Sequence, residues 1–238
     1  MGRAFEFRKE RKFKRWAAMA KTFTRIGREI AMSIKSGGSN PESNVRLRIA
    51  IQNAKGANMP KINVDNAIKK ATEKGNAAYE EITYEGHAAF GVAIIVDCAT
   101  DNTNRTVANL RTSFNKCGGE LGTHNSVKFL FEPKSVFKVK NNNYVLEDLE
   151  LALIDFGLEE LELDINEIIL ISSFQNYGNM YNALEQLSTE IISSDIQRFA
   201  TTYKTIKAEQ EEQIMKLIER LDEDDDVVNI YHNYKIEH

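Results

Sequence analysis

The side chains that could take part in catalysis are scattered along the chain. Histidine, the commonest general acid or base, occurs four times with no spacing that would bring two copies together, at His87, His124, His232 and His238. The sequence has no Gly-rich phosphate loop ending in Lys-Ser or Lys-Thr, and it has no nucleophile elbow. We therefore predict that the protein is not an enzyme and takes no small-molecule substrate.

Patterns that could hold a metal are also weak. Cys98 lies in an apolar run and Cys117 precedes a Gly-Gly turn, which is typical of buried or incidental thiols rather than of a disulfide or a zinc site. The acidic run at 222–226 lacks the glycine and the terminal glutamate of a calcium loop. It is expected to form a solvated turn before a strand. We predict no metal and no cofactor.

One junction leaves two readings open. The polar run from Asp101 to Arg105 lies between a predicted strand and a predicted helix. Its side chains can cap the helix, and a helix N-terminus with an adjacent arginine can also receive an anion. Capping is the simpler interpretation, and Arg105 is the residue with a possible second role.

Positive charge is concentrated at one end of the chain. The 238 residues have a formal net charge of −4. Residues 1–76 hold 18 Lys and Arg against 6 Asp and Glu, whereas residues 77–238 hold 13 against 29. A basic block on an acidic body indicates a protein that holds a polyanion at one end. A merely solvated charged surface explains this separation poorly.

The candidate nucleic-acid contacts are the basic residues of this block. Residues 3–16 alternate cations with aromatic rings, which suits a nucleic-acid strand through phosphate neutralisation and base stacking. The aromatic rings are better explained as side chains that pack this segment against the rest of the protein. The candidate contacts are Arg3, Arg8, Lys9, Arg11, Lys12, Lys14, Arg15, Lys21, Arg25, Arg28, Arg46, Arg48, Lys55, Lys61, Lys69 and Lys70.

The basic block predicts an arm at residues 1–21 and a three-helix bundle at residues 22–76. The apolar stripe of Phe23, Ile26, Ile30 and Ile34 makes the stretch from Thr22 to Ser36 the first helix. The second and third helices are expected to start at Asn40-Pro41 and at Asn58-Met59-Pro60, because a capping side chain before proline is typical of a helix start.

Strand periodicity replaces helical periodicity after Gly75. Residues 134–206 follow the order β-α-β-β-α-β of a ferredoxin-like unit. Residues 207–238 hold one helix and one strand, too little for a domain, so we expect them to complete the sheet begun in residues 77–133. The predicted fold is therefore α+β and multidomain, with an N-terminal three-helix bundle and two α+β domains, the last a ferredoxin-like unit inserted in the middle one.

Several long motifs occur in a fixed order along almost the whole chain. They are Asn44-x-Arg46-Leu47-Arg48, Asn58-Met59-Pro60-Lys61-x-Asn63, Tyr79-Glu80-Glu81-Ile82-Thr83-Tyr84-Glu85-Gly86, Thr100-Asp101-Asn102-x-Asn104-Arg105-Thr106, Gly118-Gly119-x-Leu121-Gly122, Asp224-Asp225-Asp226-Val227 and Tyr231-His232-Asn233. With this set the chain resembles the YebC/PmpR family of bacterial proteins, which includes the mitochondrial translational activators of cytochrome oxidase. The opening Gly2-Arg3-Ala4-Phe5 departs from the Gly-His-Ser-Lys-Trp usual in that family.

The resemblance implies a regulator of gene expression that binds nucleic acid. Family members are described as transcriptional regulators that bind promoter DNA, and also as translation factors that act on the ribosome. We expect a DNA-binding transcriptional regulatory protein, with a ribosome-associated factor that binds ribosomal RNA as the alternative. The longest apolar stretch, around Gly91 to Cys98, falls short of the roughly 20 residues of a membrane span, so we expect no membrane partner and a cytoplasmic location. The oligomeric state stays open.

Overall fold

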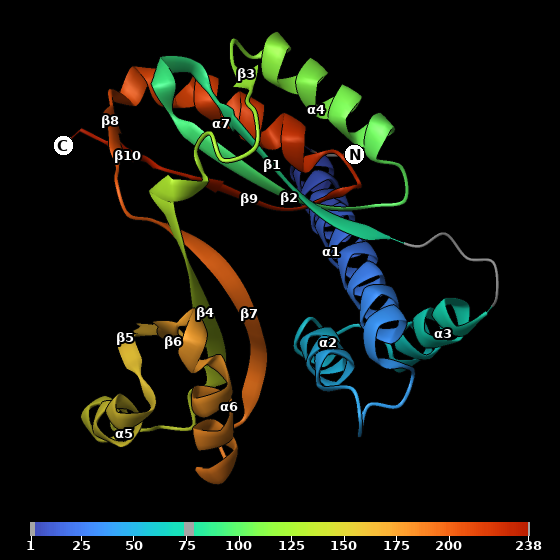
Figure 1. The fold of residues 1–238 in the computed structure, drawn as a ribbon, viewed down its shortest axis with the longest axis vertical. Coiled ribbons are helices and arrows are strands. Elements are labelled where there is room, and N and C mark those ends of the chain that lie inside the picture. Colours follow the sequence, from blue (N-terminus) through green and yellow to red (C-terminus); the bar gives the residue numbers. More distant parts are fainter. Residues whose placement is uncertain (1–2, 74–78, 238) are drawn as a thin grey trace. The chain divides into compact units, whose positions relative to one another are not determined.

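The computed structural model describes residues 3–73 and 79–237, with side chains described from residue 19 onward. The chain divides into two compact units, Met1–Glu80 and Glu81–His238. Each unit has a hydrophobic core of its own. Figure 1 shows the helices of the first unit in blue and blue-green, and the strands and helices of the second from green to red.

Three helices pack around the core of the first unit. They are α1 (Arg3–Gly37), α2 (Val45–Gly56) and α3 (Lys61–Thr72), and α1 contacts both of the others. Ile30, Leu47 and Val64 bring one buried side chain from each helix into this core. The bundle is as predicted, but α1 begins at Arg3 rather than at Thr22. Residues 3–21 contain no glycine, proline or capping residue that would stop a helix, which explains the longer element.

Asn44, not Asn40, caps the start of α2. Its Oδ1 accepts the N–H of Leu47 at 3.1 Å, and its Nδ2 donates to the carbonyl oxygens of Ser33 at 2.7 Å and Gly38 at 2.8 Å. Asn40 is exposed and closes a turn with the residues that follow it. The predicted start at Asn40-Pro41 was therefore wrong, because the asparagine that reaches three backbone groups from a buried position forms the better cap.

Asn58 ends α2 rather than capping α3. Its φ of 56° is left-handed, its N–H donates to the carbonyl of Lys55 at 3.0 Å, and the N–H of Met59 donates to the carbonyl of Ala54 at 2.9 Å. These are the two hydrogen bonds of a Schellman motif. Pro60 occupies the N-cap position of α3 without a side-chain hydrogen bond. The third helix thus begins where proline predicted it, but the asparagine serves the helix before it.

A four-stranded sheet lies at the centre of the second unit, with the order β3-β1-β2-β9. Its strands are β1 (Glu80–His87), β2 (Ala93–Thr100), β3 (Glu120–Leu121) and β9 (Val227–His232). Strand β9 pairs antiparallel with β2, and Ile95 lies opposite Tyr231. The end of the chain therefore completes the sheet that β1 begins, which confirms that the intervening ferredoxin-like unit is an insertion.

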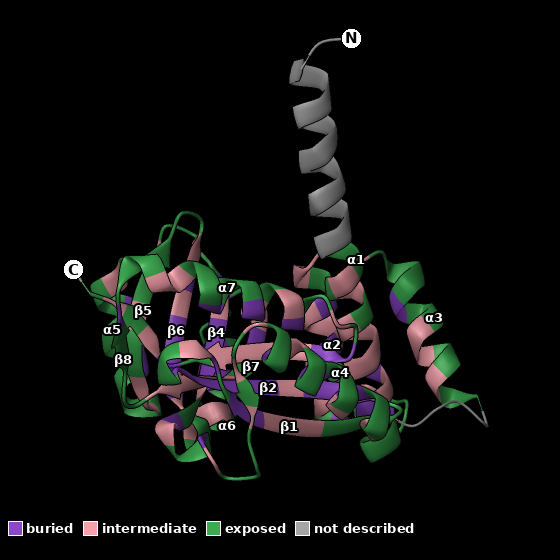
Figure 2. Ribbon diagram, turned by 90° about the horizontal axis from the view of Figure 1, so that it is seen from above, coloured by how far each residue is buried: buried purple, intermediate pink, exposed green. Residues whose placement is uncertain are grey.

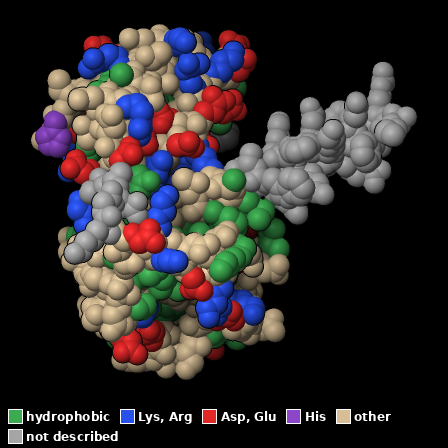
Figure 3. Space-filling view, turned by 90° about the vertical axis from the view of Figure 1, so that its right-hand side faces the viewer, with side chains coloured by type: hydrophobic (Ala, Val, Ile, Leu, Met, Phe, Trp, Pro, Cys, Tyr) green, Lys and Arg blue, Asp and Glu red, His purple; other side chains and the backbone are tan. Residues whose placement is uncertain are grey.

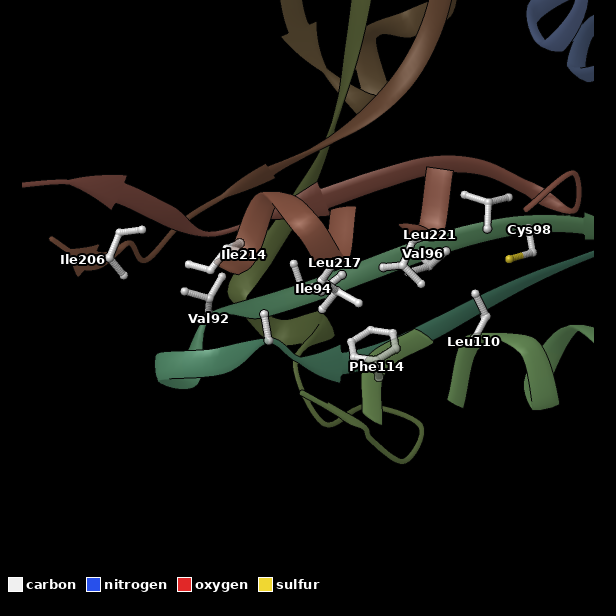
Figure 4. Packing of buried hydrophobic residues seen from close by; sticks show 12 residues of the cluster. Val92, Ile94, Val96, Cys98, Leu110, Phe114, Ile206, Ile214, Leu217 and Leu221 are labelled. Atoms are coloured by element: carbon white, nitrogen blue, oxygen red, sulfur yellow. The ribbon is translucent and has the colours of Figure 1, made fainter. Parts of the chain in front are cut away.

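Strand β2 is buried on both of its faces (Figure 2). Ile94 and Val96 point toward the helices α4 (Thr103–Lys116) and α7 (Ala208–Asp222), whose apolar side chains fill the core shown in Figure 4. Ile95, on the opposite face, packs with Phe131. Burial on both sides explains why this strand is apolar without alternation in the sequence.

The ferredoxin-like unit has the strand order β5-β6-β4-β7 with every neighbouring pair antiparallel. Its elements are β4 (Phe131–Lys140), α5 (Leu146–Leu153), β5 (Leu158–Asp164), β6 (Glu167–Ser173), α6 (Tyr177–Gln186) and β7 (Ile191–Ala200). The predicted order of strands and helices is confirmed. Strand β4 starts before the predicted boundary at residue 134, and the exact domain limits stay a prediction.

Short elements complete the second unit. Strands β8 (Lys204–Ile206) and β10 (Tyr234–Ile236) form a parallel pair. Single 3₁₀ turns lie at Ala89–Gly91, Lys128–Leu130, Ile154–Phe156 and Phe174–Asn176. Within the described residues, every helix is too short or too polar to cross a lipid bilayer.

Candidate nucleic-acid interface

Part of the predicted contact set lies outside the described side chains. Seven of its sixteen residues belong to the first turns of α1, where the helix is described and the side chains are not: Arg3, Arg8, Lys9, Arg11, Lys12, Lys14 and Arg15. Their grouping along one helix comes from the sequence and the helical backbone alone. At helical spacing Arg8, Arg11, Lys12 and Arg15 share one face.

The nine described residues of the set are distributed over all three helices of the first unit. Arg48, Lys55, Lys61, Lys69 and Lys70 are exposed, and Lys21, Arg25, Arg28 and Arg46 are partly buried. On the face of the molecule that Figure 3 shows, Lys and Arg side chains lie next to Asp and Glu side chains. Because the described cations are divided among three helices, they form a dispersed basic surface, which suits contacts to a phosphate backbone better than a single deep anion site.

Some of these cations, Arg46 and Arg28 among them, already have contacts within the first unit. The Nε of Arg46 donates to Glu29 at 2.8 Å, so this pair ties α2 to α1. The guanidinium of Arg28 lies 5.2 Å from the ring centre of Tyr79, within the range of a cation–π contact. An ion pair as exposed as that of Arg46 contributes at most about 1 kcal/mol. Both residues therefore have a structural role beside the predicted one.

Lys55, Lys69 and Lys70 lie in the last turns of their helices. A cation there interacts favourably with the carbonyl end of the helix dipole, by roughly 0.3–1 kcal/mol. These three side chains are also exposed, so helix stabilisation leaves them accessible to a ligand.

The junction before α4 proves to be a closed polar cluster. Asn102 caps the helix, because its Oδ1 accepts the N–H of Arg105 at 3.0 Å. The guanidinium of Arg105 donates to Asp101 at 2.8 Å and to the two carboxylate oxygens of Asp226 at 3.0 and 2.8 Å. These two carboxylates raise the pKa of Arg105, first through the hydrogen bond to Asp226. Two negative charges around one cation leave no excess positive charge for an anion, so capping is the role that the geometry supports.

Asp226 is the buried centre of this cluster. Its side chain is 3% exposed, and its Oδ2 accepts the hydroxyl groups of Thr100 at 3.0 Å and Thr106 at 2.8 Å as well as Arg105. Burial alone would raise the pKa of this carboxyl, but the hydrogen bonds from Arg105, Thr106 and Thr100 outweigh burial and hold the pKa below its usual value of 3.8. The acidic run is therefore not a fully solvated turn, because its last residue is a buried structural carboxylate.

A second buried carboxylate fixes the loop after β3. Glu85 is 1% exposed in its side chain, and it accepts three backbone N–H groups, from Asn125 at 2.7 Å and from Val127 and Lys128 at 2.8 Å each. Burial raises the pKa of Glu85, but the three backbone hydrogen bonds outweigh it, so the pKa lies below the usual 4.5. The alternating sequence pattern of β1 did not indicate that Glu85 binds a loop, because its backbone partners lie about 40 residues away in sequence.

A metal site has no support among the described side chains. In the described parts of the chain, no three His, Cys, Asp or Glu side chains gather as a metal ion would require. Cys98 is buried in the core and Cys117 is partly buried, and both are free thiols. Among the described residues, the titratable clusters around Asp226 and Glu85 consist of hydrogen bonds that hold loops and helix ends, and Arg198 in a third cluster donates to Asp97 and Thr83.

Comparison with known proteins gives a consistent family assignment. Residues 3–74 match the N-terminal domain of the TACO1/YebC protein, and residues 79–234 match the TACO1/YebC second and third domain. A "Probable transcriptional regulatory protein" of Porphyromonas gingivalis is 54% identical over 238 residues, covering 100% of this chain and 98% of that one. A protein of the same name from Flavobacterium johnsoniae is 52% identical over 237 residues, covering 100% of both chains.

A solved structure shares the fold as well. The crystal structure of the conserved hypothetical protein Aq1575 from Aquifex aeolicus superposes with a TM-score of 0.81 at 36% sequence identity, over 92% of this chain and 91% of that one. The matches span both units and the inserted ferredoxin-like unit. This chain belongs to the TACO1/YebC family.

Proposed function

We propose that the protein is a non-enzymatic regulator of gene expression that binds DNA through the basic surface of its first unit. The observation that carries this proposal is the division of charge, with 18 Lys and Arg against 6 Asp and Glu in residues 1–76 and the reverse imbalance in the rest. The names of the relatives, which describe transcriptional regulatory proteins, support the same class of function.

The dispersed arrangement of the cations favours contacts to phosphates over the reading of base edges. Exposed cations come from α2 and α3, and α1 adds the seven basic residues of its first turns. Phosphate contacts position a protein on nucleic acid and carry no sequence information directly. We therefore propose binding that depends strongly on salt and weakly on sequence.

A salt titration with a matched variant tests this proposal. If about six phosphates are neutralised, log K should fall with log salt at a slope near −5 on duplex DNA and near −4 on a single strand. Replacing Arg8, Arg11, Arg25 and Arg48 with alanine should weaken binding to all sequences alike and flatten the slope. The measurement is fluorescence anisotropy of labelled DNA at about 100 mM salt, where the Debye length is near 10 Å.

The control removes the same number of cations from the acidic second unit. Arg111, Lys116, Lys204 and Lys235 are all exposed there, and their replacement by alanine should leave DNA affinity nearly unchanged. Unchanged affinity in the variant of the first unit, or an equal loss in the control, would refute the assignment of the binding surface. Structured RNA bound much more tightly than duplex DNA at equal salt would replace the transcriptional role with that of a ribosome-associated translation factor.

A further inference from the structure

The ferredoxin-like unit carries a long acidic segment that DNA binding does not use. Residues 141–190 contain 11 Asp and Glu and no Lys, Arg or His. The segment includes α5, β5, β6 and α6, so the charged side chains of these four elements are all anionic. Repulsion between these carboxylates and phosphates excludes nucleic acid and anionic lipid as ligands of this surface.

Large aliphatic side chains are exposed among these carboxylates. On α5 and the turn after it, Leu149 and Leu153 are buried, whereas Leu151 is 74% and Ile154 is 56% exposed. Leu151 and Ile154 are three residues apart and therefore share one helical face. Single exposed apolar residues are ordinary, but neighbouring ones on one face mark an interaction surface.

The edge strand of the sheet also carries an exposed aliphatic side chain. Helix α5 and the 3₁₀ turn Ile154–Phe156 pack against β5, which is an edge strand (Figure 1). On β5, Leu163 is 53% exposed and lies opposite Ile168. Ile168 in turn lies opposite Val139, two residues from Phe137, whose ring contacts Tyr177 of α6. Leu163 is thus on the sheet face that the helices cover, on the same side as α5.

The turn between β5 and β6 holds another exposed aliphatic side chain. Ile165 is 88% exposed, and its φ of 35° lies in the left-handed region. A branched side chain is strained there, and Gly or Asn is the ordinary choice in such a hairpin turn. A strained, nearly fully exposed isoleucine stabilises neither the turn nor the core, so Ile165 adds apolar surface to the same acidic segment.

We propose that this surface docks a cationic amphipathic segment of a partner protein, in which Lys or Arg alternate with large apolar residues. The docking face is defined by Leu151 and Ile154 with the exposed carboxylates Glu147 and Asp155, which lie on the same side of the helical stretch. The aliphatic groups supply contact area that excludes water, and the carboxylates attract and select the basic partner. A symmetric contact with the same face of a second copy is unfavourable, since it would oppose two anionic surfaces.

The test uses the full chain and a defined peptide probe. A peptide with the sequence of residues 3–16 has seven Lys and Arg and four aromatic rings, which makes it a cationic amphipathic segment of the proposed kind. One control peptide has its four rings replaced by alanine, and another has its seven cations replaced by glutamine. By anisotropy at about 100 mM salt, the unaltered peptide should bind at least about tenfold more tightly than either control.

Variants of the chain locate the binding site. Exchange of Leu151 and Ile154 to asparagine should weaken peptide binding about tenfold, since the burial of both aliphatic groups is lost. Both residues are exposed, so the fold should persist, as circular dichroism will verify. The matched control is Ile62→Asn, an exchange on α3 of an isoleucine that is 63% exposed. It should leave peptide binding unchanged.

Three results would overturn the proposal. The peptide does not bind, or its affinity is the same in the variant of Leu151 and Ile154 as in the unaltered chain, or the ring-free control peptide binds as tightly as the original. A concentration-dependent dimer that this variant abolishes would assign the face to a second copy instead. DNA affinity should be equal in this variant and the unaltered chain, so failure here is distinguishable from failure of the proposed function.

Discussion

Asp226→Asn removes the charge at the centre of the cluster before α4 while keeping the shape of the side chain. In the folded chain this carboxylate accepts hydrogen bonds from Arg105, Thr100 and Thr106 and is 3% exposed. The exchange leaves the carbonyl oxygen as an acceptor and turns the other acceptor into a donor, so at least one of the three donors loses its partner. Arg105 is 47% exposed and can turn to water, whereas the two threonines cannot.

The size of the effect depends on which donor groups stay buried after they lose their acceptor. A hydrogen bond to a charged group contributes about 1.5–3 kcal/mol, and an unsatisfied buried hydroxyl costs a similar amount. The penalty of 3–5 kcal/mol for breaking a buried ion pair does not apply in full, because the remaining charge on Arg105 is half exposed. We expect a loss of about 1.5–3 kcal/mol in the free energy of local opening, which is roughly a ten- to hundredfold rise in the opening equilibrium.

Cys98 provides a local measurement of this opening. Its side chain is 2% exposed, and it pairs across the sheet with Val227, the residue after Asp226. In a Cys117→Ser background, the rate at which a thiol reagent labels Cys98 reports how often this part of the sheet opens. Asp226→Asn should raise that rate about ten- to hundredfold. Asp225→Asn makes the same charge change at an exposed neighbour and should have little effect.

The stabilising contribution of the Asp226 carboxylate should depend on pH. The pKa of Asp226 is lowered on folding, so its contribution is present above its usual value of 3.8 and is lost as the pH falls through the lower pKa of the folded chain. The difference between the unaltered chain and Asp226→Asn should stay constant near neutral pH and shrink only below 3.8. Equal labelling rates of the two chains at neutral pH would refute this account of the cluster.

Two further predictions concern other close contacts. A Cβ on Gly37 would lie 2.8 Å from the side chain of Asn44, so Gly37→Ala should displace the cap of α2 and lower the free energy of unfolding in urea by about 1–2 kcal/mol. The control Gly27→Ala has nothing within 4 Å of its Cβ. It should stabilise α1 and raise the free energy of unfolding by about 0.5–1 kcal/mol. Glu85→Gln should speed the hydrogen exchange of the three backbone N–H groups that this carboxylate accepts. The control Glu80→Gln, which changes an exposed residue of the same strand, should leave their exchange rates unchanged. In the unaltered chain, faster exchange of these three groups through loss of the carboxylate charge should begin only below pH 4.5, because the pKa of Glu85 is lowered.

Periodicity and turn residues were sufficient to predict the order of the elements. The change from helical to strand spacing after Gly75 separates the two units. The sequence also predicted that the last strand joins the sheet begun in residues 77–133, since an isolated terminal strand must find a sheet that is already present, and β9 pairs with β2 there. These features depend on local patterns and on chain order.

The parts that the sequence did not predict depend on contacts between distant residues. Asp226 resembles its solvated neighbours in the acidic run, and only the fold brings it to Arg105 and Thr106, more than 100 residues earlier. Asn44 and Asn40 both precede helical patterns, and the choice between them depends on the carbonyl groups at the end of α1. The contact set of the basic surface stays a prediction for the same reason, since charge along the sequence does not fix which cations meet one ligand.

The two proposed interactions involve opposite charges, so added salt weakens both, and a titration at low salt cannot separate them. Their behaviour at high salt should differ. DNA binding through phosphates has no large apolar component, whereas the docking face presents Leu151 and Ile154, which are 74% and 56% exposed. At 1 M salt the Debye length is about 3 Å, which screens surface charges but not apolar contacts. Peptide binding should therefore retain a measurable, salt-independent part at 1 M salt, while DNA binding should be lost; a peptide affinity that falls to zero along with that for DNA would show that the exposed aliphatic groups contribute nothing.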